Sequence, residues 1–280
     1  YEGGADIRIP HPHPTAPPAS RSIPYPLLME SPPILFEDAS LLVLDKPSGL
    51  AAHPGRGVPQ GESALDWART RLSPSSPALP HRLDRETSGI LVVAKTALAL
   101  RALNRAWKMK HVSKTYVALV KGNLPASGSI GLPLEDAPSG RRTRAAKGKG
   151  GTPARTDYRT LEYFRDLRPS TLDLRPSIAS LPMTSLSLVE ALPRTGRTHQ
   201  IRAHFASTGH PVAGDPLYGD PAFNRALAQS CALTRTFLHA SRIELPHPAT
   251  GKPLRLESPL PRALAEALVR LRGAGGARPT

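Results

Sequence analysis

Short apolar runs bounded by turn residues constrain the fold of this chain more than any other feature of its sequence. These runs are only a few residues long and are rich in Leu, Ile and Val, a pattern typical of buried β-strands. Two of them follow each other with only a polar turn between them, which is the spacing of a hairpin. The runs occupy residues 34–38, 41–46, 89–94, 116–120 and 186–192.

Helical patterns separate these runs. Apolar residues recur every three or four positions, as on the buried face of a helix. Because hairpins and helices alternate without a βαβ repeat, the sequence predicts an α+β fold rather than a doubly wound parallel sheet. The expected helices span 62–72, 97–108, 198–207 and 262–271.

The net charge of the chain narrows the classes of partner that it can bind. Lys and Arg number 37 against 22 Asp and Glu, which gives a net charge of +15 and favours a polyanion such as nucleic acid. No stretch approaches the eighteen apolar residues of a membrane-spanning helix, so we expect no membrane partner. The single Cys231 can form neither an internal disulfide nor a Cys-rich metal site, which indicates a reducing, cytoplasmic setting.

Composition divides the chain into regions. Residues 1–33 are rich in proline and predict an extended or disordered arm without the pattern of a secretory or transit peptide. Residues 34–271 form the predicted folded domain, and 272–280 a disordered tail. Within the domain, 139–155 carries six basic residues and no acid, which predicts a flexible loop that packs against nothing. Residues 165–182 are expected to form a surface insertion between two strands.

The most informative candidate for chemistry is Asp84. It lies between Arg82 and Arg85, just before a turn that leads into the apolar strand at 89–94. A carboxylate held among cations at the entrance of a strand stays ionised and can act as a nucleophile. Taken alone, such an aspartate is more often a residue that caps a turn.

Two further segments supply cations and an aromatic ring. Lys114 precedes Tyr116 at the start of a predicted strand, where the ring is placed to stack on a base. The segment from 194 to 218 brings three arginines and three histidines around a helix start, a natural site for a phosphate or carboxylate. Its candidate residues are Arg194, Arg197, His199 and Arg202.

Five motifs follow one another along the chain: LDKPSGLAAHPG (44–55), HRLDRETSGILVVAKT (81–96), KTYVALVKG (114–122), TGRTHQIRAHFASTGHPVAGDPLYG (195–219) and LHASRIELPHPATGKPL (238–254). In this order they resemble the RluA-type pseudouridine synthases, and the resemblance covers about four fifths of the chain. The departures are the proline-rich arm in place of an S4-type RNA-binding module, the Ala51-Ala52 pair in place of bulkier residues, and the insertion at 165–182.

The resemblance implies a mixed, largely antiparallel sheet with an active-site cleft across it, and isomerisation of uridine to pseudouridine in structured ribosomal or transfer RNA. It implies that Asp84 attacks the target uridine at ribose C1′ or uracil C6, that Arg202 pairs with this aspartate, and that Tyr116 stacks on the flipped base and serves in proton transfer at C5. Arg82 would fill the gap left by the flipped nucleotide. The expected RNA-binding residues are Arg82, Arg85, Lys114, Arg194, Arg197 and His199.

The implied reaction is redox-neutral and requires neither cofactor nor metal, and we expect a monomer. His199, His204, His210 and Asp215 lack the spacing of a metal site, so they are interpreted as packing and capping residues. His81 and His239 are interpreted as hydrogen-bond supports for the cleft.

Two other functions stay open at this point. One is an RNA-binding or chaperone protein with the same fold and no chemistry. The other is a nucleoside glycosidase, which would need a second, paired carboxylate that the sequence does not make obvious.

Overall fold

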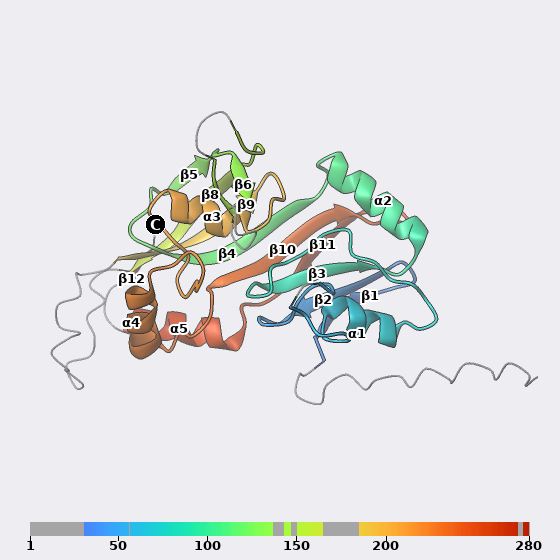
Figure 1. The fold of residues 1–280 in the computed structure, drawn as a ribbon, viewed down its shortest axis with the longest axis horizontal. Coiled ribbons are helices and arrows are strands. Elements are labelled where there is room, and N and C mark those ends of the chain that lie inside the picture. Colours follow the sequence, from blue (N-terminus) through green and yellow to red (C-terminus); the bar gives the residue numbers. More distant parts are fainter. Residues whose placement is uncertain are drawn as a thin grey trace, which may run out of the picture.

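The apolar runs form part of one ten-stranded sheet in the computed structural model, which describes residues 31–55, 57–136, 143–146, 150–164, 185–273 and 277–279 (Figure 1). Outside the main path, β11 (Pro253–Glu257) pairs with β10 and β5 (Ser127–Ile130) pairs with β8. The main path runs β1 (Ile34–Glu37), β2 (Leu41–Lys46), β3 (Ser88–Ala94), β10 (Leu238–Pro246), β4 (Ser113–Lys121), β9 (Leu186–Pro193), β8 (Thr156–Phe164) and β12 (Ala277–Pro279).

The sheet consists of two antiparallel parts that meet between β3 and β10. Among the described strand pairs this one alone is parallel, and its register has only two residue pairs, Ser88 with His239 and Gly89 with Ala240. Gly89 adopts φ +110°, and a Cβ at this position would collide with the backbone of Ala240. The two parts of the sheet can therefore approach each other only because residue 89 is glycine.

Buried polar groups reinforce this junction. Arg235 Nη2 donates to Ser88 Oγ at 2.8 Å, and Ser88 Oγ lies 3.0 Å from His239 Nδ1. The other ring nitrogen of His239 lies 3.2 Å from the Ser258 carbonyl oxygen, and burial lowers the His239 pKa, which keeps the ring neutral. His239 therefore forms hydrogen bonds at the strand junction, and its predicted support for the cleft stays a prediction.

Five helices cover the described sheet. Helices α1 (Ala64–Arg71) and α3 (Gln200–Ser207) pack on the face that carries Leu42 and Leu44. Helix α2 (Ala97–Lys108) packs on the opposite face, against Leu41 and Val43. Helices α4 (Pro221–Cys231) and α5 (Arg262–Gly273) lie side by side and cover the other part of the sheet (Figure 1). None of the helices in the described ranges is long and apolar enough to cross a membrane.

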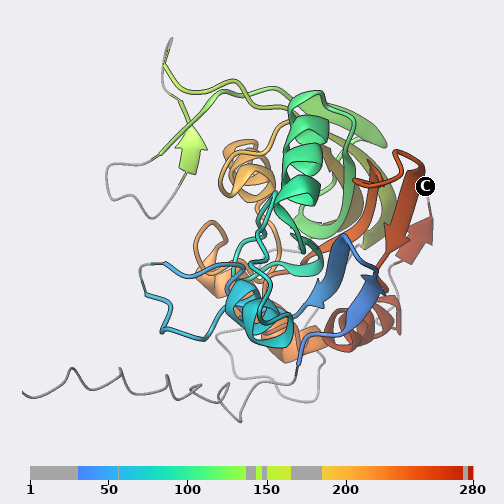
Figure 2. The same ribbon diagram turned by 90° about the vertical axis from the view of Figure 1, so that its right-hand side faces the viewer.

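A second, two-stranded sheet consists of β6 (Leu134–Asp136) and β7 (Thr143–Ala145). It lies beside α3, away from the large sheet (Figure 2). Leu134, Ala154 and Ala203 form a small apolar cluster there. This cluster attaches Leu134, which precedes the basic segment, and Ala154, near the end of that segment, to the helix that carries Arg202.

The sequence predicted most of these elements. The α+β class, the first hairpin, the strands within 89–94, 116–120 and 186–192, and the four expected helices are confirmed, with shifted ends. Helix α3 begins at Gln200 rather than at 198, because His199 has the left-handed φ of 52°. Helix α4 was not predicted, although Asp220 caps its first turn and Pro221 occupies its start.

Two segments that were predicted to be loose contain regular structure in their described parts. Thr143–Ala145, within the basic segment 139–155, pairs with β6, and both Thr143 and Ala154 are buried. The pairing satisfies the backbone, and small side chains are enough to pack against α3. In the predicted tail, 272–280, α5 continues to Gly273 and Ala277–Pro279 pairs with β8. The arm up to residue 30 and the insertion at 165–182 lie outside the described residues.

Replacement of Gly89 tests the junction between β3 and β10. Gly89→Ala combines an unfavourable positive φ with a collision against Ala240, so the free energy of unfolding should fall by at least about 2 kcal/mol. Gly61→Ala is the matched control, since Gly61 also has a positive φ but no other atom within 4 Å of the place that a Cβ would take. It should cost about 1 kcal/mol. Urea unfolding of both variants measures the difference, and equal losses would contradict the close approach.

Candidate active site

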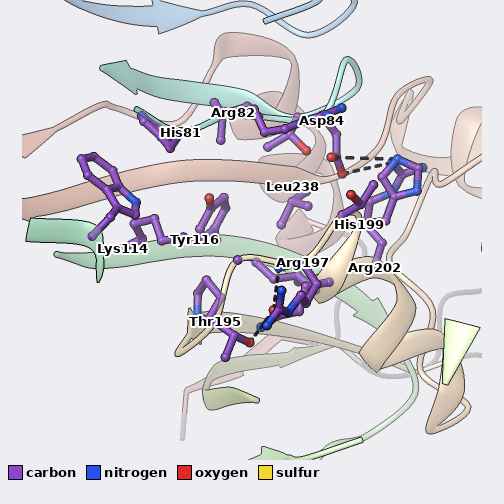
Figure 3. A pocket seen from close by; sticks show the side chains of 18 of the residues that line it. His81, Arg82, Asp84, Lys114, Tyr116, Thr195, Arg197, His199, Arg202 and Leu238 are labelled. Carbon is purple, nitrogen blue, oxygen red and sulfur yellow. Dashed lines mark hydrogen bonds and ion pairs between the residues drawn. The ribbon is translucent and has the colours of Figure 1, made fainter. Parts of the chain in front are cut away.

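A cavity of about 220 Å³ lies between the loop that leads into β3, the start of β4 and the loop before α3. Figure 3 shows Asp84, His199 and Arg202 at one end of it and His81 and Lys114 at the other. Tyr116 lies between the two ends, on β4 (Figure 3). The sequence-predicted catalytic trio of Asp84, Tyr116 and Arg202 is thus brought together around one cavity.

A buried lysine fixes the loop that carries Asp84. Lys46 is fully buried, and its Nζ donates to the carbonyl oxygens of Pro47, Leu50 and Arg85 at 2.8, 2.7 and 3.2 Å. Burial, with the nearby charge of Arg235, lowers the Lys46 pKa to about 7. Gly49 N also donates to the Arg85 carbonyl, at 2.8 Å. The turn beside Asp84 is therefore fastened to the end of β2.

Arg202 joins two carboxylates. Its Nε and Nη2 donate to Asp215 Oδ2 and Oδ1 at 2.7 and 2.9 Å, and its Nη1 donates to Asp84 Oδ2 at 3.3 Å. Asp215 is fully buried and Arg202 is 3% exposed, whereas Asp84 is 15% exposed. Burial opposes ionisation of both Asp215 and Arg202, but their mutual hydrogen bonds outweigh it, which lowers the Asp215 pKa and raises the Arg202 pKa. Both groups stay charged, and Asp84 faces the open end of the guanidinium.

His199 and Tyr218 complete this end of the cavity. Thr143 N donates to Tyr218 Oη at 2.8 Å, and the same oxygen lies 3.0 Å from His199 Nδ1. The other ring nitrogen of His199, Nε2, lies 3.9 Å from Asp84 Oδ1. Burial lowers the His199 pKa, although the charge of Asp84 opposes this. The Tyr218 ring also stacks beneath the guanidinium of Arg202, 5.2 Å from its centre.

Tyr116 presents a buried ring to the same cavity. Burial, and secondly the negative charge of Asp84, raise the Tyr116 pKa far above its ordinary value of 10. The phenol is therefore protonated at neutral pH. Its neighbour along the wall is Leu238 of β10, so the space between them is apolar (Figure 3). Such a wall suits the flat face of a nucleobase.

The structure places four of the six predicted RNA-binding residues at the cavity and two outside it. Arg82, Lys114, Arg197 and His199 line the cavity. The Nε of Arg85 instead donates to the Gly49 carbonyl at 2.7 Å, and that of Arg194 donates to Asp157 at 2.7 Å, so both lie outside it.

His81 supports the cavity at its far end. Its Nε2 accepts from Val92 N at 2.9 Å, and its ring stacks on Trp107 with centroids 5.1 Å apart. Burial, with the charge of Lys114 second, lowers the His81 pKa to about 3. The expected supporting role of His81 is confirmed, and the ring is neutral at physiological pH.

The importance of Asp215 and Lys46 was not predicted from the sequence. Asp215 was interpreted as a capping residue, and it does accept from the backbone N–H groups of Leu217 and Tyr218. Its bidentate pairing with Arg202 had no local signal, since thirteen residues separate the two. Across the described ranges, His, Cys, Asp and Glu side chains form no group of three or more that could hold a metal ion.

Comparison with known proteins identifies the family. A family model described as RNA pseudouridylate synthase matches residues 40–207, a range that includes Asp84, Tyr116 and Arg202. The chain belongs to this family. Among solved structures, the human RNA pseudouridylate synthase domain containing 4 superposes with a TM-score of 0.64 at 25% identity, covering 85% of this chain and 92% of that one. The resemblance drawn from the five motifs is confirmed.

Bacterial relatives are more similar in sequence. The chain is 40% identical over 247 residues to ribosomal large subunit pseudouridine synthase D of Nitrosomonas europaea, with 85% of this chain and 65% of the relative covered. It is 40% identical over 244 residues to ribosomal large subunit pseudouridine synthase C of Yersinia pestis, with 85% and 69% covered. The chain thus spans about two thirds of the length of these family members.

The Arg202–Asp215 pair should be essential to stability. Asp215→Ala leaves a buried guanidinium without its main partner, so we expect a loss of about 3–5 kcal/mol in the free energy of unfolding. The control is Glu266→Ala, which removes the partner of the exposed Arg262 and should leave the urea midpoint unchanged. Similar midpoints for the two variants would contradict the structural role of the pair.

The low pKa of His81 predicts acid sensitivity. Below pH 6.5 the unfolded chain binds a proton at this ring, while the folded protein does not until about pH 3. Stability is therefore fully present above pH 6.5 and falls as the pH drops, by up to about 1.4 kcal/mol per unit. Between pH 7.5 and 5 the wild type should lose about 2 kcal/mol more than His81→Gln.

Urea unfolding at the two pH values measures this effect. His111→Gln, which changes an exposed ring, should keep the wild-type dependence on pH. Equal slopes for wild type and His81→Gln would show that His81 is not held neutral in the folded protein.

Proposed function

We propose that this protein isomerises uridine to pseudouridine in ribosomal RNA of the large subunit, with Asp84 as the nucleophile. The observation that carries the proposal is the partly exposed carboxylate of Asp84, held by Arg202 at 3.3 Å in a cavity that has an apolar wall at Tyr116. The family match and the names of the two bacterial relatives support both the reaction and the class of RNA.

The reaction demands a cavity of this kind. Asp84 attacks ribose C1′ or uracil C6, the bond between N1 and C1′ breaks, the uracil turns, and a bond forms between C5 and C1′. The C5 proton leaves, N1 is protonated, and the carboxylate is released. Because the base is detached part-way, the site must retain it and exclude water. The Tyr116 and Leu238 side chains form an apolar wall that serves this purpose.

Arg202 keeps a counter-ion even when Asp84 loses its charge. When Asp84 forms a covalent bond, its negative charge is lost. Asp215 still neutralises the buried guanidinium, through hydrogen bonds of 2.7 and 2.9 Å. The site therefore tolerates the covalent intermediate without leaving a buried cation unpaired.

The pKa of the Tyr116 phenol depends on the same covalent step at Asp84. The charge of Asp84 is one cause of the raised Tyr116 pKa. Covalent attack removes that charge, which makes the phenol more acidic at the stage when the C5 proton must be taken. The ring stacks on the base in the early steps, and the hydroxyl takes part in proton transfer in the later one.

Substrate binding depends on charge. The net charge of +15 favours the RNA backbone, and flipping a base costs a few kcal/mol that phosphate contacts can offset. Arg82, Arg197 and His199 line the cavity and are proposed to contact the flipped nucleotide and its neighbours. We further propose that the enzyme is cytoplasmic and monomeric. Its one cysteine is a buried free thiol, and its exposed large apolar residues in the described ranges are scattered.

The alternative function of RNA binding without chemistry is less well supported. A carboxylate in a cavity that must attract phosphate weakens binding, so a protein that only binds RNA gains nothing from Asp84.

Substitution of the nucleophile tests the proposal. Asp84→Asn keeps the volume of the side chain but removes the attacking carboxylate, so the rate should fall at least about 10³-fold while RNA affinity stays the same or rises slightly. The assay measures release of tritium from C5 of uridine in transcribed large-subunit ribosomal RNA. Asp220→Asn, at the cap of α4, is the matched control and should retain full activity. Turnover by Asp84→Asn would rule out the mechanism.

A further inference from the structure

A second cavity, of about 590 Å³, adjoins the active-site cavity. The two share a boundary made of Trp107, Lys114, Pro193, Thr195 and Gly196. Beyond this boundary, the walls carry the cations Lys110, Arg155 and Arg194, and the last two share the single carboxylate of Asp157 at 2.8 and 2.7 Å. The second cavity is therefore positively charged and large enough for part of a nucleotide.

Two side chains that line the active-site cavity, His81 and Trp107, each have a buried donor without an acceptor. Within the described part of the chain, His81 Nδ1 and Trp107 Nε1 are the buried side-chain nitrogen and oxygen atoms that have no hydrogen-bond partner. His81 Nε2 already accepts from Val92 N, so the proton of the neutral ring is on Nδ1. The indole nitrogen is a donor only. Each unpaired buried donor costs free energy that an acceptor from a ligand would recover.

Lys114 adds a cation at the same place. It lines both cavities, and among the described residues its ammonium group makes no hydrogen bond or ion pair. Burial lowers the Lys114 pKa, and no neighbouring carboxylate offsets this. Figure 3 shows Lys114 and His81 on opposite walls at the same end of the cavity. Three donors without an acceptor, one of them charged, thus belong to side chains that line the active-site cavity, and Trp107 and Lys114 also line the second one.

We propose that His81, Trp107 and Lys114 bind a backbone phosphate of the RNA next to the target uridine, so that the neighbouring nucleotide enters the second cavity. An anionic oxygen satisfies both N–H donors and neutralises the ammonium group. The cations that line the second cavity then lie along the RNA strand where it leaves the active site. The inference rests on the proposed function only in that the anion belongs to RNA.

A test that does not depend on turnover uses the two tryptophans of the chain. The full-length protein, labelled with ¹⁵N, is titrated with single-stranded pentauridylate, with the same oligomer carrying neutral methylphosphonate linkages, and with inorganic phosphate. The charged oligomer should shift the Trp107 indole proton downfield, as a new hydrogen bond does. The Trp67 indole, which lines neither cavity, should stay in place.

The neutral oligomer should leave the Trp107 resonance unshifted and bind at least about tenfold more weakly. Inorganic phosphate should produce the shift only at far higher concentration. An unmoved Trp107 resonance with the charged oligomer, or an equal shift by the neutral one, overturns the proposal. An equal response to phosphate at the same concentration also overturns it, because the site would then bind the free ion.

Matched variants separate charge from hydrogen bonding. Lys114→Met should weaken pentauridylate binding about tenfold and reduce the slope of log K against log salt by about 0.7, as one phosphate contact on a single strand is lost. Trp107→Phe keeps an aromatic ring but removes the donor, so affinity should fall with the salt slope unchanged. Lys108→Met removes an exposed charge that lines neither cavity and should bind like the wild type.

The outcome is independent of the isomerase assay. A Trp107 shift with no isomerase activity would leave the phosphate site standing and reject the enzyme function. Isomerase activity without the shift would support the enzyme function and reject the phosphate site.

Discussion

The buried ion pair between Arg202 and Asp215 is the interaction on which the rest of the site depends. A guanidinium that is almost fully buried needs a permanent anion, and Asp215 supplies one through two short hydrogen bonds. This pairing fixes the plane of the guanidinium, so one nitrogen is left to point at Asp84. The Tyr218 ring packs beneath the guanidinium, and the Tyr218 hydroxyl in turn contacts His199, so the pairing also positions these two rings. One carboxylate holds the arginine, and the other stays partly exposed to the cavity.

The strands β2, β3, β4 and β9 were predictable because they are short and mostly buried on both faces. In β2, alternate residues such as Leu41 and Leu42 pack into different clusters on the two sides of the sheet, so the whole run is apolar and easy to recognise. Strand β10 was missed because it contains buried polar residues such as His239, which are satisfied by partners far away in the sequence. Residues 143–145 were misjudged because backbone pairing and small side chains, rather than bulk, hold them in place.

The site residues that lie in sequence motifs were predictable. Those that only the fold brings together were not. Asp84, Tyr116 and Arg202 were identified through the family resemblance, and they do surround one cavity. Composition alone would not have separated Arg194 from Arg197, yet one pairs with Asp157 and the other lines the cavity. A cation's usefulness to a ligand depends on whether a carboxylate already holds it, and that depends on tertiary structure.

The short parallel junction has a consequence for synthesis of the protein. Ser88 lies beside His239, a residue 151 positions later, and side chains that line the cavity come from both sides of this contact. A nascent chain on the ribosome can complete β1, β2 and β3 early, but β10 is made only after the segments that carry α2, β4, β9 and α3. Asp84 is consequently exposed without the β10 side of its cavity until translation has passed that strand, so the cavity forms late in synthesis of this domain.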